Sequence, residues 1–158
     1  GISQGMQPIM SHNYGKGKYG NVNKILKYGL ILMGTFAAAI YAVMFFGSEY
    51  VAAIFNSEHN ETLQYIAEEG LKLYYIACPF VGFNIIISIF FTSTEYPVPA
   101  HIISILRGFA LIIPMAFIML FAGGRIGLWM AFPVTEMIVT VIGIILYIMR
   151  NRKLKEHI

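Results

Sequence analysis

Long apolar runs without a single charged residue constrain this sequence more than any other feature. Residues 28–46 and 73–94 contain no Asp, Glu, Lys or Arg. A transmembrane helix needs about 20 mostly apolar residues, because each residue advances the helix by about 1.5 Å. Hydrophobic residues make up 58% of the chain and charged residues only 12%, too few for the polar surface of a soluble globule. The composition excludes a soluble enzyme, a nucleic-acid binder and a disordered chain, and it predicts an all-α integral membrane protein.

The apolar runs predict a polytopic membrane helical bundle with four full transmembrane helices and the end of a fifth. The full helices are expected over about residues 28–46, 73–94, 100–122 and 126–149. Residues 1–13 are typical of the last part of an earlier helix and lack the basic leader and cleavage site of a signal peptide. We therefore expect Gly1 to be a truncation point. Residues 150–158 are expected to form a tail, and Glu95–Pro99 a tight turn, because its two prolines cannot continue a helix without strain.

The distribution of charge predicts how the bundle is oriented. Four lysines precede the first full helix, and four basic residues follow the last: Lys16, Lys18, Lys24, Lys27, Arg150, Arg152, Lys153 and Lys155. Residues 47–72 hold five glutamates and a single lysine. Basic residues favour the cytoplasmic side of a membrane. We therefore expect both ends of the chain, including the C-terminal tail, in the cytoplasm, and residues 47–72 in an outer loop.

Glu136 is the strongest candidate for a functional residue, since it lies near the middle of the last predicted helix. Polar side chains at membrane depth are costly, so they mark interiors, ion pathways or binding sites. Glu136 is either a protonatable or cation-attracting group that faces a cavity, or a carboxylate held by Arg107 or by backbone groups. Arg107, in the preceding helix, is expected to extend to the interface or to brace one helix against another.

A second polar face runs along residues 73–94. Asn84, Ser88 and Thr92 are four residues apart and therefore share one side of a helix. For Ser88 and Thr92 we favour hydrogen bonds between helices, and for Asn84 the wall of a cavity. Gln4 and Gln7 are three residues apart and share a face of the first helix.

Four prolines within apolar runs predict kinked helices: Pro8, Pro79, Pro114 and Pro133. The four histidines and one cysteine show no spacing typical of a metal site. No catalytic Ser/His/Asp or Cys/His set and no phosphate-binding glycine loop is present either. The sequence therefore predicts no enzyme activity, no metal and no cofactor.

Three stretches together resemble one protein family. They are GISQGMQPIMSHNYG at residues 1–15, FFTSTE at residues 90–95 leading to SILR at residues 104–107, and GLWMAFPVTE at residues 127–136. The chain is similar over essentially its whole length to the bacterial branch of the multidrug and toxic compound extrusion (MATE) family. Members of this family have twelve helices in two lobes of six, with both termini cytoplasmic. The resemblance implies that residues 1–158 belong to the C-terminal lobe and run from within the eighth helix to the end of the twelfth.

The resemblance also implies a function. The family exports organic cations and amphipathic drugs across the cytoplasmic membrane in exchange for protons or sodium ions, by alternating access. Glu136 matches a position where members often keep an acid after the proline, and Gln7 and Pro8 match the motif of the helix pair. The ion pathway is expected to involve Glu136, Asn84, Gln7, Gln4, Ser88 and Arg107. Most of the coupling-ion site is expected in the N-terminal lobe, which would be the main partner of this chain alongside the lipid bilayer.

Two alternatives remain at this point. One is a flippase for lipid-linked sugars in the same superfamily, although such cavities carry several basic residues and this chain has only Arg107 at depth. The other is a short membrane protein that does not transport, either a subunit or a fragment.

Overall fold

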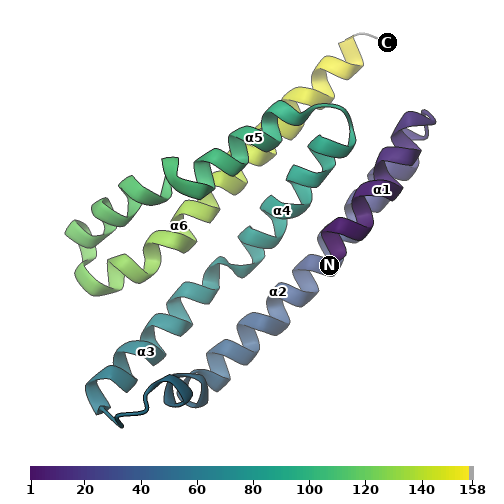
Figure 1. Cartoon of the computed structure of the whole chain (residues 1–158). Helices are drawn as coiled ribbons and strands as arrows, with labels where there is room; N and C mark the ends of the chain where they lie inside the picture. Colours follow the sequence, from purple (N-terminus) through teal and green to yellow (C-terminus); the bar gives the residue numbers. More distant parts are fainter. Residues whose placement is uncertain (157–158) are drawn as a thin grey trace.

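The structure is a computed structural model that describes residues 1–156, with side chains described through Arg152, and this part is helical without a strand. Figure 1 shows a bundle of antiparallel helices. The elements are α1 (Ile2–Gly15), α2 (Tyr19–Phe55), α3 (Glu61–Tyr74), a 3-10 turn (Tyr75–Ala77), α4 (Cys78–Ser93), α5 (Pro97–Ile105), a π-helical turn (Leu106–Ala110) and α6 (Ile112–Glu156). The predicted all-α class is confirmed.

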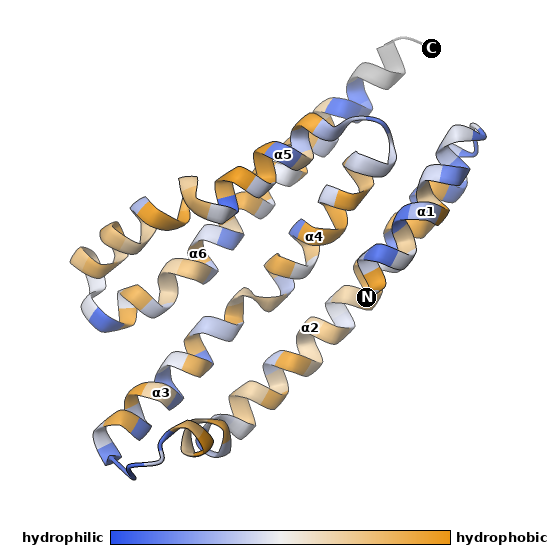
Figure 2. Cartoon of the chain, in the orientation of Figure 1, coloured by the Kyte–Doolittle hydropathy of each residue, from blue (hydrophilic) through white to orange (hydrophobic). Residues whose placement is uncertain are grey.

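In the described part of the chain, three segments are long and apolar enough to cross a membrane: Tyr19–Phe55, Glu61–Ser93 and Ile112–Arg152. The first contains the predicted helix 28–46, and the second contains the predicted helix 73–94 except for Thr94. The predicted helix 100–122 is not one continuous α-helix, because the π-helical turn interrupts it. The count of four full spans and part of a fifth therefore stays a prediction. Apolar residues dominate the middle of the bundle in Figure 2.

Helix α6 contains a sharp reversal. Gly124 has φ 57° and ψ −134°, outside the helical region, so the residues before and after it form two antiparallel arms (Figure 1). Glycine suits this position because it adopts positive φ at little steric cost. The second arm approaches the first so closely that a Cβ atom on Gly127 would overlap the carbonyl of Met119.

Two of the four predicted proline kinks coincide with irregular backbone. A proline ring clashes with the carbonyl four residues earlier and offers no N–H to it. Before Pro79, the Cys78 N–H bonds to the Tyr75 carbonyl in a 3-10 turn. Before Pro114, the Leu111 N–H reaches the Leu106 carbonyl at 2.9 Å, which is a π-helical bond.

The other two prolines lie inside helices. Pro8 is within α1, and Pro133 is within the second arm of α6. Whether these two prolines bend their helices stays a prediction.

The connections between the helices are shorter than expected. The predicted turn Glu95–Pro99 is wrong in extent, because Pro97 and Pro99 form the first turn of α5, where a proline needs no N–H partner. Glu95, with φ 56°, makes the turn instead.

The predicted outer loop 47–72 is mostly helix. Helix α2 runs to Phe55, and Asn60 caps α3 by accepting a hydrogen bond from the Leu63 N–H at 3.1 Å. Apolarity defines the membrane core but not the helix ends.

The predicted tail also begins with helix. Helix α6 continues past the expected end at Met149 to Glu156. The remaining two residues of the tail lie outside the described part of the chain.

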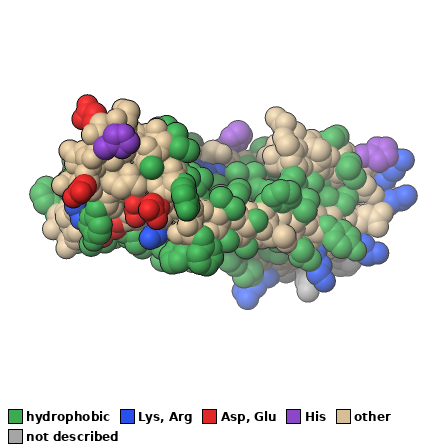
Figure 3. Space-filling model, turned by 90° about the horizontal axis from the view of Figure 1, so that it is seen from below, with side chains coloured by type: hydrophobic (Ala, Val, Ile, Leu, Met, Phe, Trp, Pro, Cys, Tyr) green, Lys and Arg blue, Asp and Glu red, His purple; other side chains and the backbone are tan. Residues whose placement is uncertain are grey.

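The two ends of the bundle differ in charge. The α1–α2 turn, the α4–α5 turn and the C-terminal end of α6 lie at one end, and the α2–α3 connection and the Gly124 reversal lie at the other (Figure 1). Figure 3 shows acidic side chains at one end of the molecule, with a few basic side chains among them, and a group of basic side chains at the opposite end. Both basic segments of the sequence therefore share one end, as their charge predicts.

Helix α4 is the centre of the fold. It packs against α1, α2, α5 and α6. Its side chains Ile86, Phe90 and Phe91 are almost fully buried, together with Met10 of α1 and Ile103 of α5. The polar residues of α4 are therefore positioned by contacts on several sides.

Substituting Gly127→Ala should destabilise the bundle, because the new methyl group meets backbone that cannot move aside. Overpacking of this kind costs about 1–3 kcal/mol. Thermal unfolding in detergent, followed by fluorescence-detected size exclusion, measures the effect. Gly123→Ala is the matched control, since its Cβ would meet nothing within 4 Å. Equal melting temperatures for the two variants would contradict the close approach of the two arms.

Candidate functional site

Glu136 lies at the centre of a polar cluster formed by three helices. It comes from the second arm of α6, is fully buried, and uses both carboxylate oxygens. Its Oε1 lies 2.9 Å from an Nη atom of Arg107 and accepts a hydrogen bond from Nε at 3.0 Å. Its Oε2 accepts a hydrogen bond from Nδ2 of Asn84 at 2.8 Å. One oxygen is therefore paired with a charge and the other with a neutral amide.

The irregular segment after α5 supplies the positive charge. Arg107 belongs to the π-helical turn Leu106–Ala110, which precedes Pro114 by one turn. π-Helical turns are rare and occur often at functional sites. The Arg107 side chain is 23% exposed, whereas that of Glu136 is 1% exposed. The guanidinium therefore links a fully buried carboxylate to the edge of the bundle.

Asn84 and Thr140 complete the cluster. Asn84 of α4 is fully buried and also donates to the backbone carbonyl of Glu136 at 3.1 Å. The Thr140 hydroxyl lies within hydrogen-bond distance of the Asn84 side-chain oxygen, at 3.1 Å, and of the Glu136 carbonyl, at 2.9 Å. A hydroxyl has one proton, so it serves one acceptor at a time. Asn84 thus holds both the side chain and the backbone of Glu136.

The arrangement balances charge inside an apolar bundle. A buried carboxylate is tolerated only when a counter-charge and hydrogen-bond donors replace its water. Removing one partner of such a pair typically costs about 3–5 kcal/mol, because the other charge stays buried without compensation. Glu136 and Arg107 therefore stabilise each other within the apolar bundle.

The structure brings three of the six predicted pathway residues together. Glu136, Asn84 and Arg107 form the cluster described above. The Ser88 hydroxyl instead bonds to the Asn84 carbonyl of its own helix at 2.7 Å, and that of Thr92 bonds to the Ser88 carbonyl at 2.9 Å. The hydrogen bonds between helices expected for these two residues are thus replaced by bonds within α4.

The other two predicted residues lie elsewhere. Gln4 and Gln7 are exposed on α1, which packs against α2 and α4 but not against α5. Their role in a pathway stays a prediction.

Thr140 is the cluster member that sequence reasoning did not select. Its position four residues after Glu136 places it on the same helix face, and this spacing is the signal that could have identified it. No group of three or more His, Cys, Asp or Glu side chains able to hold a metal ion occurs within the described part of the chain.

Comparisons with known proteins agree on the fold. The family model MatE matches residues 1–118. A solved structure described as the inward-facing conformation of a multidrug resistance MATE family transporter of the MOP superfamily is similar, with a TM-score of 0.89 and 18% identity. The similarity covers 98% of this chain and 36% of that protein, so the chain spans about a third of its length. No curated protein matches the sequence.

Substituting Asn84→Ala should destabilise the bundle, because it removes the donor to Glu136 and the acceptor for Thr140. Leaving buried polar groups without partners costs about 1–3 kcal/mol. Ser88→Ala is the control, since that hydroxyl bonds only to its own helix backbone. Thermal unfolding in detergent should show a clearly lower melting temperature for Asn84→Ala and a small decrease for Ser88→Ala. Melting temperatures equal to that of the parent protein for both variants would contradict the cluster described here.

Proposed function

Since the chain belongs to the multidrug and toxic compound extrusion family, we propose that it forms most of the C-terminal lobe of a cation-coupled multidrug efflux antiporter. Its cargo would be organic cations and amphipathic compounds, and its coupling ion a proton or sodium. It would act by alternating access, in which two lobes move around a binding site near the membrane midplane. In this proposal the chain is part of a transporter and not an enzyme.

The fully buried carboxylate of Glu136 is the observation that carries the proposal. Intramembrane ionisable residues typically face the interior of a bundle and mark ion or proton pathways. Glu136 is held by one cation and one amide, so neutralising it changes the balance of the whole cluster. A ligand shifts a conformational equilibrium only if it binds the two states with different affinity. A proton or cation at Glu136 would meet this condition, because it competes with Arg107.

The remainder of the transporter is proposed to complete the site. The similar solved structure is about three times as long as the matched region, and the description of that protein is a multidrug resistance transporter. We propose that an N-terminal lobe of the same polypeptide pairs with this chain and holds most of the coupling-ion site. The localisation that follows is the bacterial cytoplasmic membrane, with the C-terminus in the cytoplasm as the basic residues favour.

The flippase alternative is less well supported. A cavity for an anionic lipid-linked sugar needs free positive charge, whereas Arg107 is paired with Glu136 at 2.9 Å. The cluster carries one positive and one negative side chain, so it offers little net attraction to an anion.

Substituting Glu136→Gln in the full-length transporter should lower efflux of a cationic dye such as ethidium at least tenfold. Glutamine keeps the size of the side chain and one acceptor oxygen, but it cannot take up a proton, balance the charge of Arg107 or accept from both Arg107 and Asn84. The matched control is Glu49→Gln on the exposed end of α2, which should leave efflux unchanged. Efflux is measured in cells that lack other pumps, with membrane expression of every variant quantified by immunoblot.

Two further experiments distinguish a coupling role of Glu136 from a structural one. Collapsing the proton gradient or removing sodium identifies the ion on which the parent protein depends. Arg107→Lys, which keeps the charge, should retain more efflux than Arg107→Met. Normal efflux by the Glu136→Gln protein at normal expression would refute the proposed role of the carboxylate. If the parent protein exports no drug at all, the second alternative, a subunit or fragment that does not transport, is favoured.

A further inference from the structure

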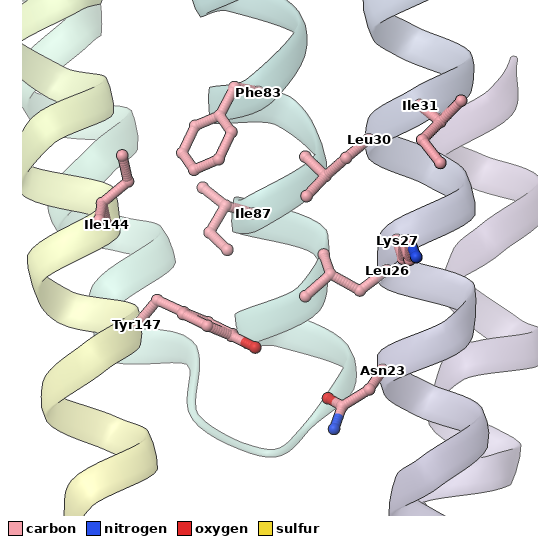
Figure 4. Close-up of a pocket in the computed structure, with 9 residues that line it drawn as sticks. All are labelled: Asn23, Leu26, Lys27, Leu30, Ile31, Phe83, Ile87, Ile144 and Tyr147. Atoms are coloured by element: carbon pink, nitrogen blue, oxygen red, sulfur yellow. The ribbon is translucent and has the colours of Figure 1, made fainter.

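A groove runs along one side of the bundle, away from the polar cluster. Helices α2 and α6 both pack against α4, but they do not pack against each other. The space between them is a cavity of about 350 Å³ whose floor is formed by Phe83 and Ile87 of α4 (Figure 4). Cavities of about 300–1,000 Å³ are typical of ligand sites.

The groove lies on a different face of α4 from the Glu136 site. On the polar face, Asn84 directly follows Phe83 and Ser88 directly follows Ile87. Successive residues of an α-helix are about 100° apart around its axis, so the two pairs point in different directions. The rims of the groove are apolar and exposed, with Ile31 of α2 56% exposed and Ile144 of α6 41% exposed. An exposed apolar rim on a membrane helix suits the acyl chain of a lipid, because lipid tails are as apolar as leucine.

One end of the groove is polar. The lining residues of α2 form a stripe that changes from Leu30 and Ile31 to Lys27 and Asn23 toward the basic end of the bundle. Across the groove, the ring of Tyr147 reaches from α6 toward α2, with its hydroxyl directed to the same end (Figure 4). The groove therefore combines apolar walls with an ammonium, an amide and a phenol at one mouth.

Lys27 has no acidic partner in the described part of the protein. Neither of the two ion pairs among the described side chains involves it, and the sequence contains no acidic residue before Glu49. The nearby guanidinium of Arg150 does not line the groove and lies over the ring of Phe90, with its centre 4.8 Å from the ring centroid. Lys27 is thus the cation available at this mouth.

We propose that this groove is a binding site for one anionic phospholipid from the leaflet at the basic end of the bundle. An acyl chain would lie along Phe83, Ile87 and Ile144, and the phosphate would meet the ammonium of Lys27. Asn23 and Tyr147 would add hydrogen bonds at the level where amphipathic rings sit in a membrane. Basic pockets between transmembrane helices are known to take anionic lipid head groups. The site is independent of the transport cycle proposed above.

Native mass spectrometry of the full-length protein tests the site. The protein is mixed with dioleoylphosphatidylglycerol or with dioleoylphosphatidylcholine, and the fraction that carries one bound lipid is measured. The anionic lipid should be retained preferentially. One basic residue near an anionic head group raises the affinity for that lipid about fivefold. Lys27→Gln should therefore lower retention of phosphatidylglycerol about fivefold, whereas Lys24→Gln, one helix turn away and outside the groove, should leave it near the parent value.

A second pair of variants tests the shape of the groove without changing charge. Ile144→Trp fills the cavity and should abolish retention of the single lipid, whereas Ile145→Trp on the neighbouring exposed position should not. Equal losses for Lys24→Gln and Lys27→Gln would show attraction to surface charge and overturn the proposal. Equal retention of the two lipids, or retention that survives Ile144→Trp, would overturn it as well. Melting temperatures of all four variants verify that each protein is folded.

Discussion

A carboxylate inside an apolar helix bundle needs donors or a counter-charge at both of its oxygens in place of water. Glu136 meets this condition through Arg107 on one oxygen and Asn84 on the other, at 2.9 and 2.8 Å. These partners come from three separate helical segments, so the pairing fixes the register of α4, the π-helical turn and α6 relative to one another. The Thr140 hydroxyl adds a further link across the same contact. Much of the bundle is therefore arranged around one buried charge.

The backbone irregularities supply the geometry that regular helices lack. The ring of Pro114 cannot accommodate the carbonyl of Ala110 within an α-helix, and the chain responds with the π-helical turn that contains Arg107. The 3-10 turn before Pro79 lies in the same way between α3 and α4. The 3-10 turn adjoins the N-terminal end of α4, and the π-helical turn follows α5, so neither interruption lies within the central helix. The prolines thus set the positions of polar groups as well as the directions of helices.

The sequence predicted the polar centre of this protein better than its helix boundaries. The absence of charge in residues 28–46 and 73–94 identified helices that are long and apolar enough to cross a membrane, and the depth of Glu136 singled it out as the central polar residue. The sequence also raised the possibility of its pairing with Arg107. It missed the contact with Asn84, because two residues 52 positions apart are brought together only by helix packing. It also missed the continuation of α2 and α6 into charged residues, since helical hydrogen bonds persist where the chain leaves the hydrocarbon.

The central position of α4 connects the two features proposed here. One face of α4 holds Glu136 through Asn84, and the adjacent face forms the floor of the groove through Phe83 and Ile87. Helix α6 takes part in both, since it carries Glu136 and also the groove residues Ile144 and Tyr147. The two features therefore share the helices α4 and α6 but no residue.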